Sequence, residues 1–536
     1  MPETATRADS TTSAMSQPFS ANAPRDDPAT LDRFARSTGP WGTRPGGVAY
    51  PTSTVQVQNL VRIAGEHNLK LYPISRGKNW GYGDACAPSD GQVIVDLSRM
   101  NRIVEVNEDL AYCVIEPGVS QGQLADYLAE HHPNLWLDVT GAGRDASVVG
   151  NTLDRGFGHT RYGDHFLTAC GLQVVMPDGS VLDTGFTGYE NHQAGRVYRY
   201  GTGPFLDGLF AQSNLGICTR IGLWLMPKPE ALCAYFFYAD RDEQLEQIID
   251  RLAKLRMQGL LQSTIHIGND LRVISARTRY PYDRAGGRTP LPDDLRQTLR
   301  REYGVGAWNA GGALYGTPGT VKAMTKRLAR ELRGFHLKFV DDRKLALART
   351  VTRGLNRIGL GRQLTELLDV VEPVYGLLKG VPSDEPLRGA SWRVRDPEPA
   401  DPTDPLETHA GLIWSSPILP NRGASARAVL ELLEPIYARH GFEPLVTFTM
   451  ITERAMVAVT NIAYDRRDEQ QSAAAGVCYD ELTDALINSG YIPYRVSPKA
   501  AAKLAATDTP YWQTARKIKA ALDPGNIISP GRYVRD

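Results

Sequence analysis

The chain has 536 residues and no formal net charge, with 42% hydrophobic and 22% charged residues. This length exceeds one ordinary core and predicts two large domains. The neutral balance gives no electrostatic attraction to nucleic acid or to an anionic membrane, and we expect neither partner. Six scattered cysteines form no CxxC pair. They indicate reduced thiols in a cytoplasmic protein, with neither a disulfide framework nor a metal site.

Residues 1–30 are rich in Ser, Thr, Ala, Pro and Asp. Such a segment buries too little apolar surface to offset its ordering entropy, and we expect a disordered tail. Residues 31–229 then alternate between helical and strand-like patterns. Helical spacing is found at 55–64 and 122–131, and β-like runs at 70–74, 93–97, 111–115, 172–176 and 221–226. This mixture predicts an α+β domain.

From residue 230 onwards the pattern changes. Amphipathic stretches at 243–255, 321–332 and 424–439 alternate with β-like runs such as 445–449. They predict a second α+β domain over residues 230–495. The last segment, 496–536, carries a predicted helix that ends at Asp523-Pro524-Gly525-Asn526, followed by an extended tail.

Residues 73–83 follow a predicted strand and contain three glycines and two cations, Arg76 and Lys78. Glycine lets the backbone approach a ligand closely, and consecutive amide groups can bind a phosphate. The spacing fits neither the dinucleotide GxGxxG nor the Walker pattern. Taken alone, the segment is equally consistent with an ordinary glycine-rich turn. Small and polar residues recur at 147–151, 162–165 and 212–217, and a large dinucleotide cofactor needs contacts from such separated loops.

With these motifs, the chain resembles the vanillyl-alcohol oxidase and p-cresol methylhydroxylase family of FAD enzymes. The resemblance runs from residue 48 to 533, through segments 73–83, 136–139, 150–151, 162–165, 212–217, 221–227, 308–309, 312–316, 494–495 and 523–528. It implies a PCMH-type FAD-binding domain over 31–229 and a smaller α+β cap domain over 230–495. Residues 496–536 would return to the FAD domain, and the protein would be a homodimer or larger.

The resemblance also implies a cofactor and a set of binding residues. The cofactor would be FAD, bound by Ser75, Arg76, Gly77, Lys78, Asn79, Trp80, Gly81, Ser147, Gly150, Asn151, Gly163, Asp164, Asn214, Gly216, Ile217 and Arg532. The substrate would be a 4-substituted phenol, bound as phenolate by Tyr82, Tyr494 and Arg495. Hydride removal would then give a quinone methide, and either O2 or an acceptor protein would reoxidise the flavin. A guanidinium and two phenol donors suit an oxyanion.

Other family positions are changed in this sequence. The acid–base aspartate is replaced by Ala142, and the nearby Asp145 is either a substitute or, as we favour, a loop carboxylate. The family tyrosine is replaced by His159, a candidate acid or base whose alternative role is structural. The paired histidines are replaced by Val457-Ala458. The groups that would direct water onto a quinone methide are therefore missing, while the oxyanion site is kept.

We therefore expect an FAD-dependent oxidoreductase acting on a 4-substituted phenol or a related aromatic substrate. One alternative is a biosynthetic flavin enzyme acting on a non-phenolic alcohol, an amine or a carbon–carbon bond, and another is a flavin-binding protein without catalysis. The residue that would link the flavin covalently is Leu412, which has no nucleophilic atom. We expect non-covalent FAD, with His409 as the fallback for a covalent bond.

Overall fold

The computed structural model describes residues 24–357, 362–395 and 404–534. Helix α2 (Pro28–Phe34) begins inside the segment expected to be a disordered tail, because Asp27 caps its first turn. Just before it, Arg25 forms a β-bridge with Val48. The remainder of the expected tail, residues 1–23, lies outside the described residues.

The first α+β region is built around two main sheets. A three-stranded parallel sheet has the order β1-β3-β2, and a five-stranded antiparallel sheet has the order β4-β5-β9-β7-β8. Their strands are β1 (Gly47–Ala49), β2 (Leu71–Ile74), β3 (Val93–Asp96), β4 (Ile103–Asn107), β5 (Tyr112–Ile115), β7 (Ala169–Val175), β8 (Val181–Asp183) and β9 (Ile217–Trp224). A small pair joins β6 (Leu135–Trp136) to β10 (Met226–Pro227). Serine side chains cap the helices α3 (Thr54–His67), α4 (Gln121–His131) and α5 (Val148–Leu153).

The second α+β region contains a larger antiparallel sheet, with the order β14-β11-β13-β12-β17-β18-β15 and β16 paired to β18. Its strands are β11 (Ala231–Ala239), β12 (Ile265–Asn269), β13 (Trp308–Gly316), β14 (Lys338–Val340), β15 (Ala410–Ser415), β16 (Ile418–Pro420), β17 (Leu445–Met450) and β18 (Ala455–Asp465). Although we expected the cap to be the smaller domain, its sheet is the larger one in the described chain.

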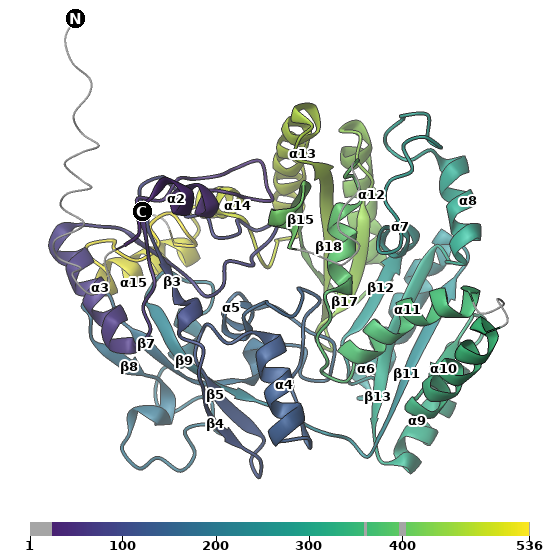
Figure 1. The fold of residues 1–536 in the computed structure, drawn as a ribbon, viewed down its shortest axis with the longest axis horizontal. Coiled ribbons are helices and arrows are strands. Elements are labelled where there is room, and N and C mark those ends of the chain that lie inside the picture. Colours follow the sequence, from purple (N-terminus) through teal and green to yellow (C-terminus); the bar gives the residue numbers. More distant parts are fainter. Residues whose placement is uncertain (1–23, 358–361, 396–403, 535–536) are drawn as a thin grey trace, which may run out of the picture.

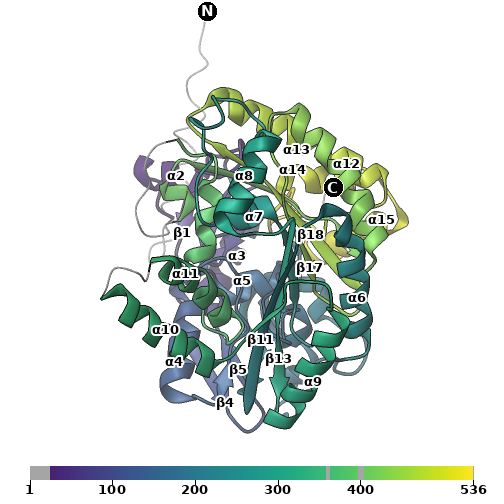
Figure 2. The ribbon, with the colours of Figure 1, turned by 90° about the vertical axis from the view of Figure 1, so that its right-hand side faces the viewer.

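Helices cover both faces of the larger sheet (Figure 2). One face packs on α6 (Leu245–Met257), α9 (Pro318–Glu331), α12 (Gly423–Arg439) and α13 (Glu469–Asn488), and encloses the largest core. On the other side lie α7 (Asp270–Ser275), α8 (Asp293–Tyr303), α10 (Asp342–Asn356), α11 (Arg362–Leu377) and the 3-10 segment η6 (Glu385–Ser391). Alternation decides which residue faces which side: Val446 and Phe448 enter the core, while Thr447 and Thr449 face the opposite way.

The C-terminal segment returns to the first region, where yellow elements lie beside the purple α3 in Figure 1. It contains α14 (Pro498–Ala505) and α15 (Pro510–Leu522). Ile528 bridges Leu71 of β2, and its side chain packs in the core beneath α3. The ammonium group of Lys519, nearly fully buried, donates to the carbonyl oxygens of Asn214 and Ile528.

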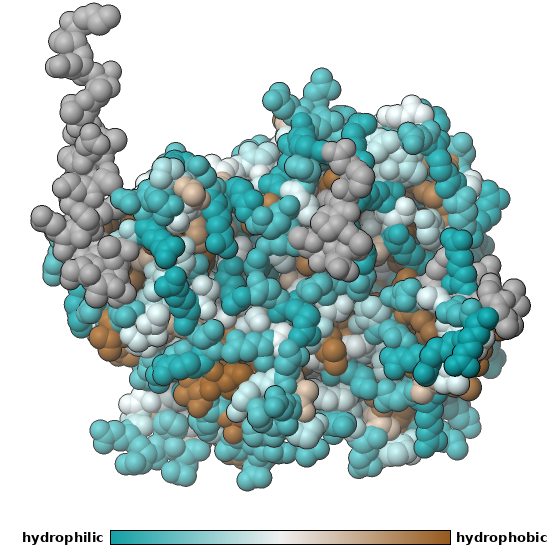
Figure 3. Space-filling view, in the orientation of Figure 1, coloured by the Kyte–Doolittle hydropathy of each residue, from teal (hydrophilic) through white to brown (hydrophobic). Residues whose placement is uncertain are grey.

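The outer surface is mostly hydrophilic on the face shown in Figure 3, where apolar residues form separate small areas. Among the described helices, none combines the length and hydropathy needed to span a membrane.

Candidate active site

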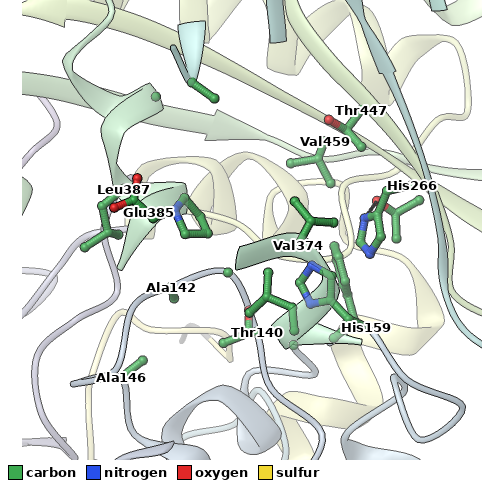
Figure 4. A pocket seen from close by; sticks show the side chains of 18 of the residues that line it. Thr140, Ala142, Ala146, His159, His266, Val374, Glu385, Leu387, Thr447 and Val459 are labelled. Atoms are coloured by element: carbon green, nitrogen blue, oxygen red, sulfur yellow. Dashed lines mark hydrogen bonds between the residues drawn. The ribbon is translucent and has the colours of Figure 1, made fainter. Parts of the chain in front are cut away.

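A cavity of about 2140 Å3 opens between the two regions. Loops of the first region line one side, with Thr140, Ala142 and His159 pointing into it (Figure 4). The inner face of the large sheet lines the other side, with Thr447 and Val459. The cavity therefore lies where the two regions meet, and it draws residues from both.

Strand β2 leads directly into the glycine-rich loop at one end of the cavity. Gly77 has a φ of +67°, a conformation that disfavours other residues. In the described part of the chain, the amide groups of Gly77, Lys78, Asn79 and Trp80 donate to no protein acceptor. A Cβ added to Gly150 of α5 would collide with the Ser75 hydroxyl, so this helix lies against the loop. Consecutive unpaired amides beside a cavity fit a bound phosphate.

The two cations of this loop are neutralised by the protein itself. The Arg76 guanidinium forms an ion pair with Asp145, and its Nε donates to the Asp145 carbonyl oxygen at 2.8 Å. Lys78 pairs with Asp404 and lies 3.6 Å from the Asp145 carboxylate. This placement fits the interpretation of Asp145 as a loop carboxylate. The free donors of the loop are then its backbone amides.

Most of the residues expected to bind the cofactor line this cavity. They are Ser75, Arg76, Gly77, Lys78, Asn79, Trp80, Ser147, Gly150, Asn151, Gly216, Ile217 and Arg532. Four others are not among the residues that line it: Gly81, Gly163, Asp164 and Asn214. Gly81 packs on the Trp414 ring, and the Asn214 side chain donates to the carbonyl oxygens of Ser529 and Val534.

The three residues expected to bind an oxyanion come together at the cavity wall. The Arg495 guanidinium lies 4.7 Å from the centre of the Tyr82 ring, and the Tyr82 hydroxyl is 2.7 Å from Ser416 Oγ. Arg495 Nη2 donates to Asn79 Oδ1 at 2.6 Å and to Asp154 Oδ2 at 2.7 Å. Its Nε is buried and has no partner in the described chain.

The electrostatics of this cluster keep the arginine charged and the phenols neutral. Burial disfavours the charge of Arg495, but Asp154, Tyr494 and Tyr82 outweigh it and raise its pKa above the ordinary value. Burial raises the pKa of Tyr494, and it raises that of Tyr82 further. The site therefore offers a permanent cation and two protonated hydroxyls, which are all donors.

His159 lies beside a second histidine, His266 of β12, with the rings stacked at 4.5 Å (Figure 4). His159 Nδ1 is 2.9 Å from the carbonyl oxygen of Val139, so in the neutral ring Nδ1 carries the proton and Nε2 has the lone pair. Burial lowers the pKa of His159, and burial together with His159 lowers the pKa of His266 well below 6.5. Both rings are neutral at neutral pH.

The backbone around His159 is fixed by a buried carboxylate. Asp138 accepts hydrogen bonds from the amides of His159 and Thr160, and His165 lies 2.8 Å from its Oδ1. The second ring nitrogen of His165 is 2.6 Å from Asn151 Oδ1. The side-chain oxygen of Asn151 is therefore bonded within this network. Asn151 still lines the cavity, as part of helix α5.

Sequence reasoning missed several residues of the site. Asp154 pairs with Arg495 and also accepts from the Tyr533 hydroxyl, and its sequence neighbourhood shows no motif of its own. His266 lies alone in a short strand, and the Trp414 amide of β15 donates to the carbonyl oxygen of Gly81 in a loop distant in sequence. One signal in the sequence pointed to Trp414 and Ser416: they lie close to Leu412, the position at which a covalent flavin link would form. Leu412 lines the cavity, whereas His409 is exposed outside it.

Comparisons with known proteins define the class. Residues 45–185 match the FAD binding domain model. The chain is 38% identical to 1'-carboxy-chondrochloren decarboxylase of Chondromyces crocatus, over 94% of this chain and 93% of that protein. It is 32% identical to the flavoprotein subunit of 4-cresol dehydrogenase of Pseudomonas putida, over 91% and 87%. The protein is an FAD-dependent oxidoreductase, and its cofactor is FAD.

Solved structures agree with this result. The structure of p-cresol methylhydroxylase with substrate bound has a TM-score of 0.85 at 29% identity, covering 96% of this chain and 94% of the other. The 4-ethylphenol oxidase from Gulosibacter chungangensis has a TM-score of 0.87 at 28% identity, covering 98% of both chains. The chain belongs to the vanillyl-alcohol oxidase and p-cresol methylhydroxylase family.

Proposed function

We propose that this enzyme oxidises a phenol that carries a para side chain, and that it binds the phenol as phenolate between Tyr82, Tyr494 and Arg495. The observation that carries the proposal is the unpaired Nε of Arg495, buried beside two tyrosines. A buried guanidinium that keeps one unpaired donor beside two phenol hydroxyls favours binding of an anion by charge-assisted hydrogen bonds. The names of two similar proteins, 4-cresol dehydrogenase and 4-ethylphenol oxidase, describe such phenols.

Phenolate binding prepares the substrate for oxidation. The negative oxygen raises the electron density of the ring, which makes loss of a hydride from the para benzylic carbon feasible and leaves a quinone methide. The bound FAD supplies the two-electron acceptor for this step. Arg495, kept charged by Asp154, holds the ring oxygen in place throughout. Neutral His159, with the Nε2 lone pair, can accept a proton that the substrate releases.

The unpaired amides of residues 77–80 are the groups that would hold the FAD pyrophosphate, with the α5 wall against them. We propose that the flavin ring is held without a covalent bond. Leu412 occupies the cavity wall, and it has no atom that could form the linkage.

A second candidate function concerns the fate of the quinone methide. The family acid–base position is Ala142, which points into the cavity as an apolar side chain (Figure 4). Loss of CO2 from the side chain needs no activated water. The bond to the carboxylate breaks, its electron pair forms the side-chain double bond, and the ring returns to phenolate. One similar protein is named as a decarboxylase, which favours this outcome for carboxylated substrates.

Anaerobic mixing of the holoenzyme with 4-ethylphenol tests the main proposal. We expect bleaching of the oxidised flavin, and no bleaching with ethylbenzene, which lacks the hydroxyl. A flavin that stays oxidised with every para-substituted phenol, but is reduced by a non-phenolic alcohol or an amine, would contradict the phenolate site. A flavin that no compound reduces would favour a non-catalytic role.

A further inference from the structure

A second arginine faces the same cavity, from helix α7. Arg272 Nη2 donates to the carbonyl oxygen of Leu445 at 3.1 Å, and its guanidinium lies 5.3 Å from the centre of the Trp414 ring. Among the described residues no carboxylate forms an ion pair with it. Arg272 lines the cavity, so its remaining donors have access to a ligand.

Asn461 of β18 lies next to this arginine and also lacks partners. It is 1% exposed and lines the cavity, yet neither its Nδ2 nor its Oδ1 has a hydrogen-bond partner in the described structure. In the sheet it is in register with Leu445 on one side and with Trp414 on the other. These are the two residues that Arg272 contacts, so the amide and the guanidinium share one corner of the cavity.

This corner is connected to the oxyanion site. The Trp414 amide donates to the Gly81 carbonyl oxygen at 3.2 Å, and Gly81 directly precedes Tyr82. Thr447 and Val459 line the sheet side of the cavity (Figure 4). Thr447 pairs with Gly268 of the neighbouring strand β12. A single elongated ligand can therefore face both arginines from one cavity.

We propose that Arg272 and Asn461 bind a carboxylate on the side chain of the substrate, so that the enzyme acts on an aromatic acid. The planar guanidinium fork suits a carboxylate, and the Asn461 amide adds a donor. The phenol end of this substrate rests on the proposed function, while the carboxylate end rests on Arg272 and Asn461 alone.

The charge state of Arg272 agrees with this assignment. Burial lowers its pKa to about 10, and the nearby Tyr437 opposes this effect. A carboxylate bound beside it would supply the missing counter-charge. The same chemistry could come from a phosphate of the cofactor, and the experiment separates the two sources.

The test measures dissociation constants by equilibrium dialysis against the anaerobically reduced holoenzyme, because the reduced flavin cannot oxidise the phenols. The ligands are 3-(4-hydroxyphenyl)propanoate, 3-phenylpropanoate, the amides of both acids, and 4-ethylphenol. We expect each acid to bind about tenfold more tightly than its amide, as charge-assisted hydrogen bonds predict. Arg272→Gln should bring this ratio close to one and leave 4-ethylphenol binding unchanged.

A second variant keeps the test informative if Arg272→Gln fails to fold. Asn461→Asp preserves the side-chain shape and places a carboxylate beside Arg272, so it should also abolish the preference for acids. Arg277→Gln is the matched control, because this arginine lines the same cavity but donates to the Tyr303 carbonyl oxygen and not to Leu445, the strand neighbour of Asn461. It should leave the preference intact.

An acid preference that survives both Arg272→Gln and Asn461→Asp would overturn the proposal. So would a loss of FAD from these variants without any change in acid preference, because the corner would then serve the cofactor. If 4-ethylphenol fails to bind but 3-phenylpropanoate still distinguishes the wild type from Arg272→Gln, the phenolate site is wrong and the carboxylate site stands.

Discussion

Two arginines reach one cavity, and the protein treats them differently. Arg495 is fixed by Asp154 and Asn79, and these contacts keep it charged whether or not a ligand is present. Arg272 has a carbonyl oxygen and an aromatic ring as neighbours, and burial lowers its pKa to about 10. The charge of Arg495 is therefore balanced within the folded protein, while the charge of Arg272 has no carboxylate partner until an anionic ligand binds.

The difference between the two arginines indicates that the two ends of the cavity have different functions. A preorganised cation costs no reorganisation when charge develops on the substrate, which suits the end where the ring oxygen becomes a phenolate. An arginine without a carboxylate partner discriminates more strongly among ligands, because only an acidic ligand balances its charge. Reactivity would thus depend on one end of the cavity and selection on the other.

The largest expected effect concerns how the flavin is attached. If Leu412 replaces the residue that would form a covalent linkage, acid precipitation should leave all of the yellow colour in the supernatant. Mass spectrometry of the peptides checks the result. Colour in the pellet, with a flavin-sized mass on the peptide containing His409, would show that the cap holds the flavin covalently.

Removal of each arginine should affect stability in different ways. Arg495→Met leaves Asp154 buried without its main counter-charge and should lower the free energy of unfolding by about 3–5 kcal/mol. Arg272→Met removes a cation that has no carboxylate partner and should change it by less than about 1 kcal/mol. Urea unfolding of the two holoenzymes measures both values. Adding Asp154→Asn to Arg495→Met should restore part of the loss, and equal losses from the two single variants would refute the comparison.

A smaller effect is expected at the hydroxyl donors. Tyr494→Phe should weaken binding of 4-ethylphenol by about 1.5–3 kcal/mol, the value for a hydrogen bond to a charged group, and leave the FAD content unchanged. Equilibrium dialysis against the anaerobically reduced holoenzyme gives the dissociation constant. Tyr479→Phe serves as the control, because this buried tyrosine faces Ser497 outside the cavity wall. An unchanged affinity in Tyr494→Phe would remove this residue from the oxyanion site.

The smallest expected effect is a pH dependence. The pKa values of His159 and His266 are lowered in the folded protein, so the unfolded chain binds more protons below about pH 6.5. The free energy of unfolding should therefore fall as the pH drops below this value, by up to about 1.4 kcal/mol per unit of pKa difference. Replacing both residues by glutamine should flatten the profile. A slope that is the same in the wild type and in the double variant would contradict the assignment.

Local patterns in the sequence were sufficient for some of the elements. Apolar spacing at 55–64 predicted the helix found at Thr54–His67, and the run at 445–449 predicted the strand Leu445–Met450. Glycine and cation content are local properties, so residues 73–83 could be singled out from the sequence, and their role as a phosphate loop stays a prediction. The recognised pair Tyr494-Arg495 came from the family resemblance, since nothing in their immediate neighbours distinguishes them from a strand residue and a surface cation.

Other parts of the site could not be predicted because they depend on sheet pairing. Arg272 lies in a six-residue helix, too short for a hydrophobic period to be visible. Asn461 is one polar residue in the mostly apolar strand Ala455–Asp465. Its role depends on the residues that face it from the strands on either side. Helices α10 and α11, which line the cavity, were also missed, as was Asp154, whose partner Arg495 lies in a distant segment.

The position of the C-terminal segment has a consequence for biosynthesis. Tyr533 donates to Asp154, Asn214 donates to the carbonyl oxygen of Val534, and Arg532 lines the cavity. These contacts join residues 320 and 379 positions apart, so the wall of the cavity is complete only once residues 532–534 have been synthesised and have docked on the first region. Ending the chain before Arg532 should therefore leave Asp154 and Asn214 without these partners and give colourless apoprotein.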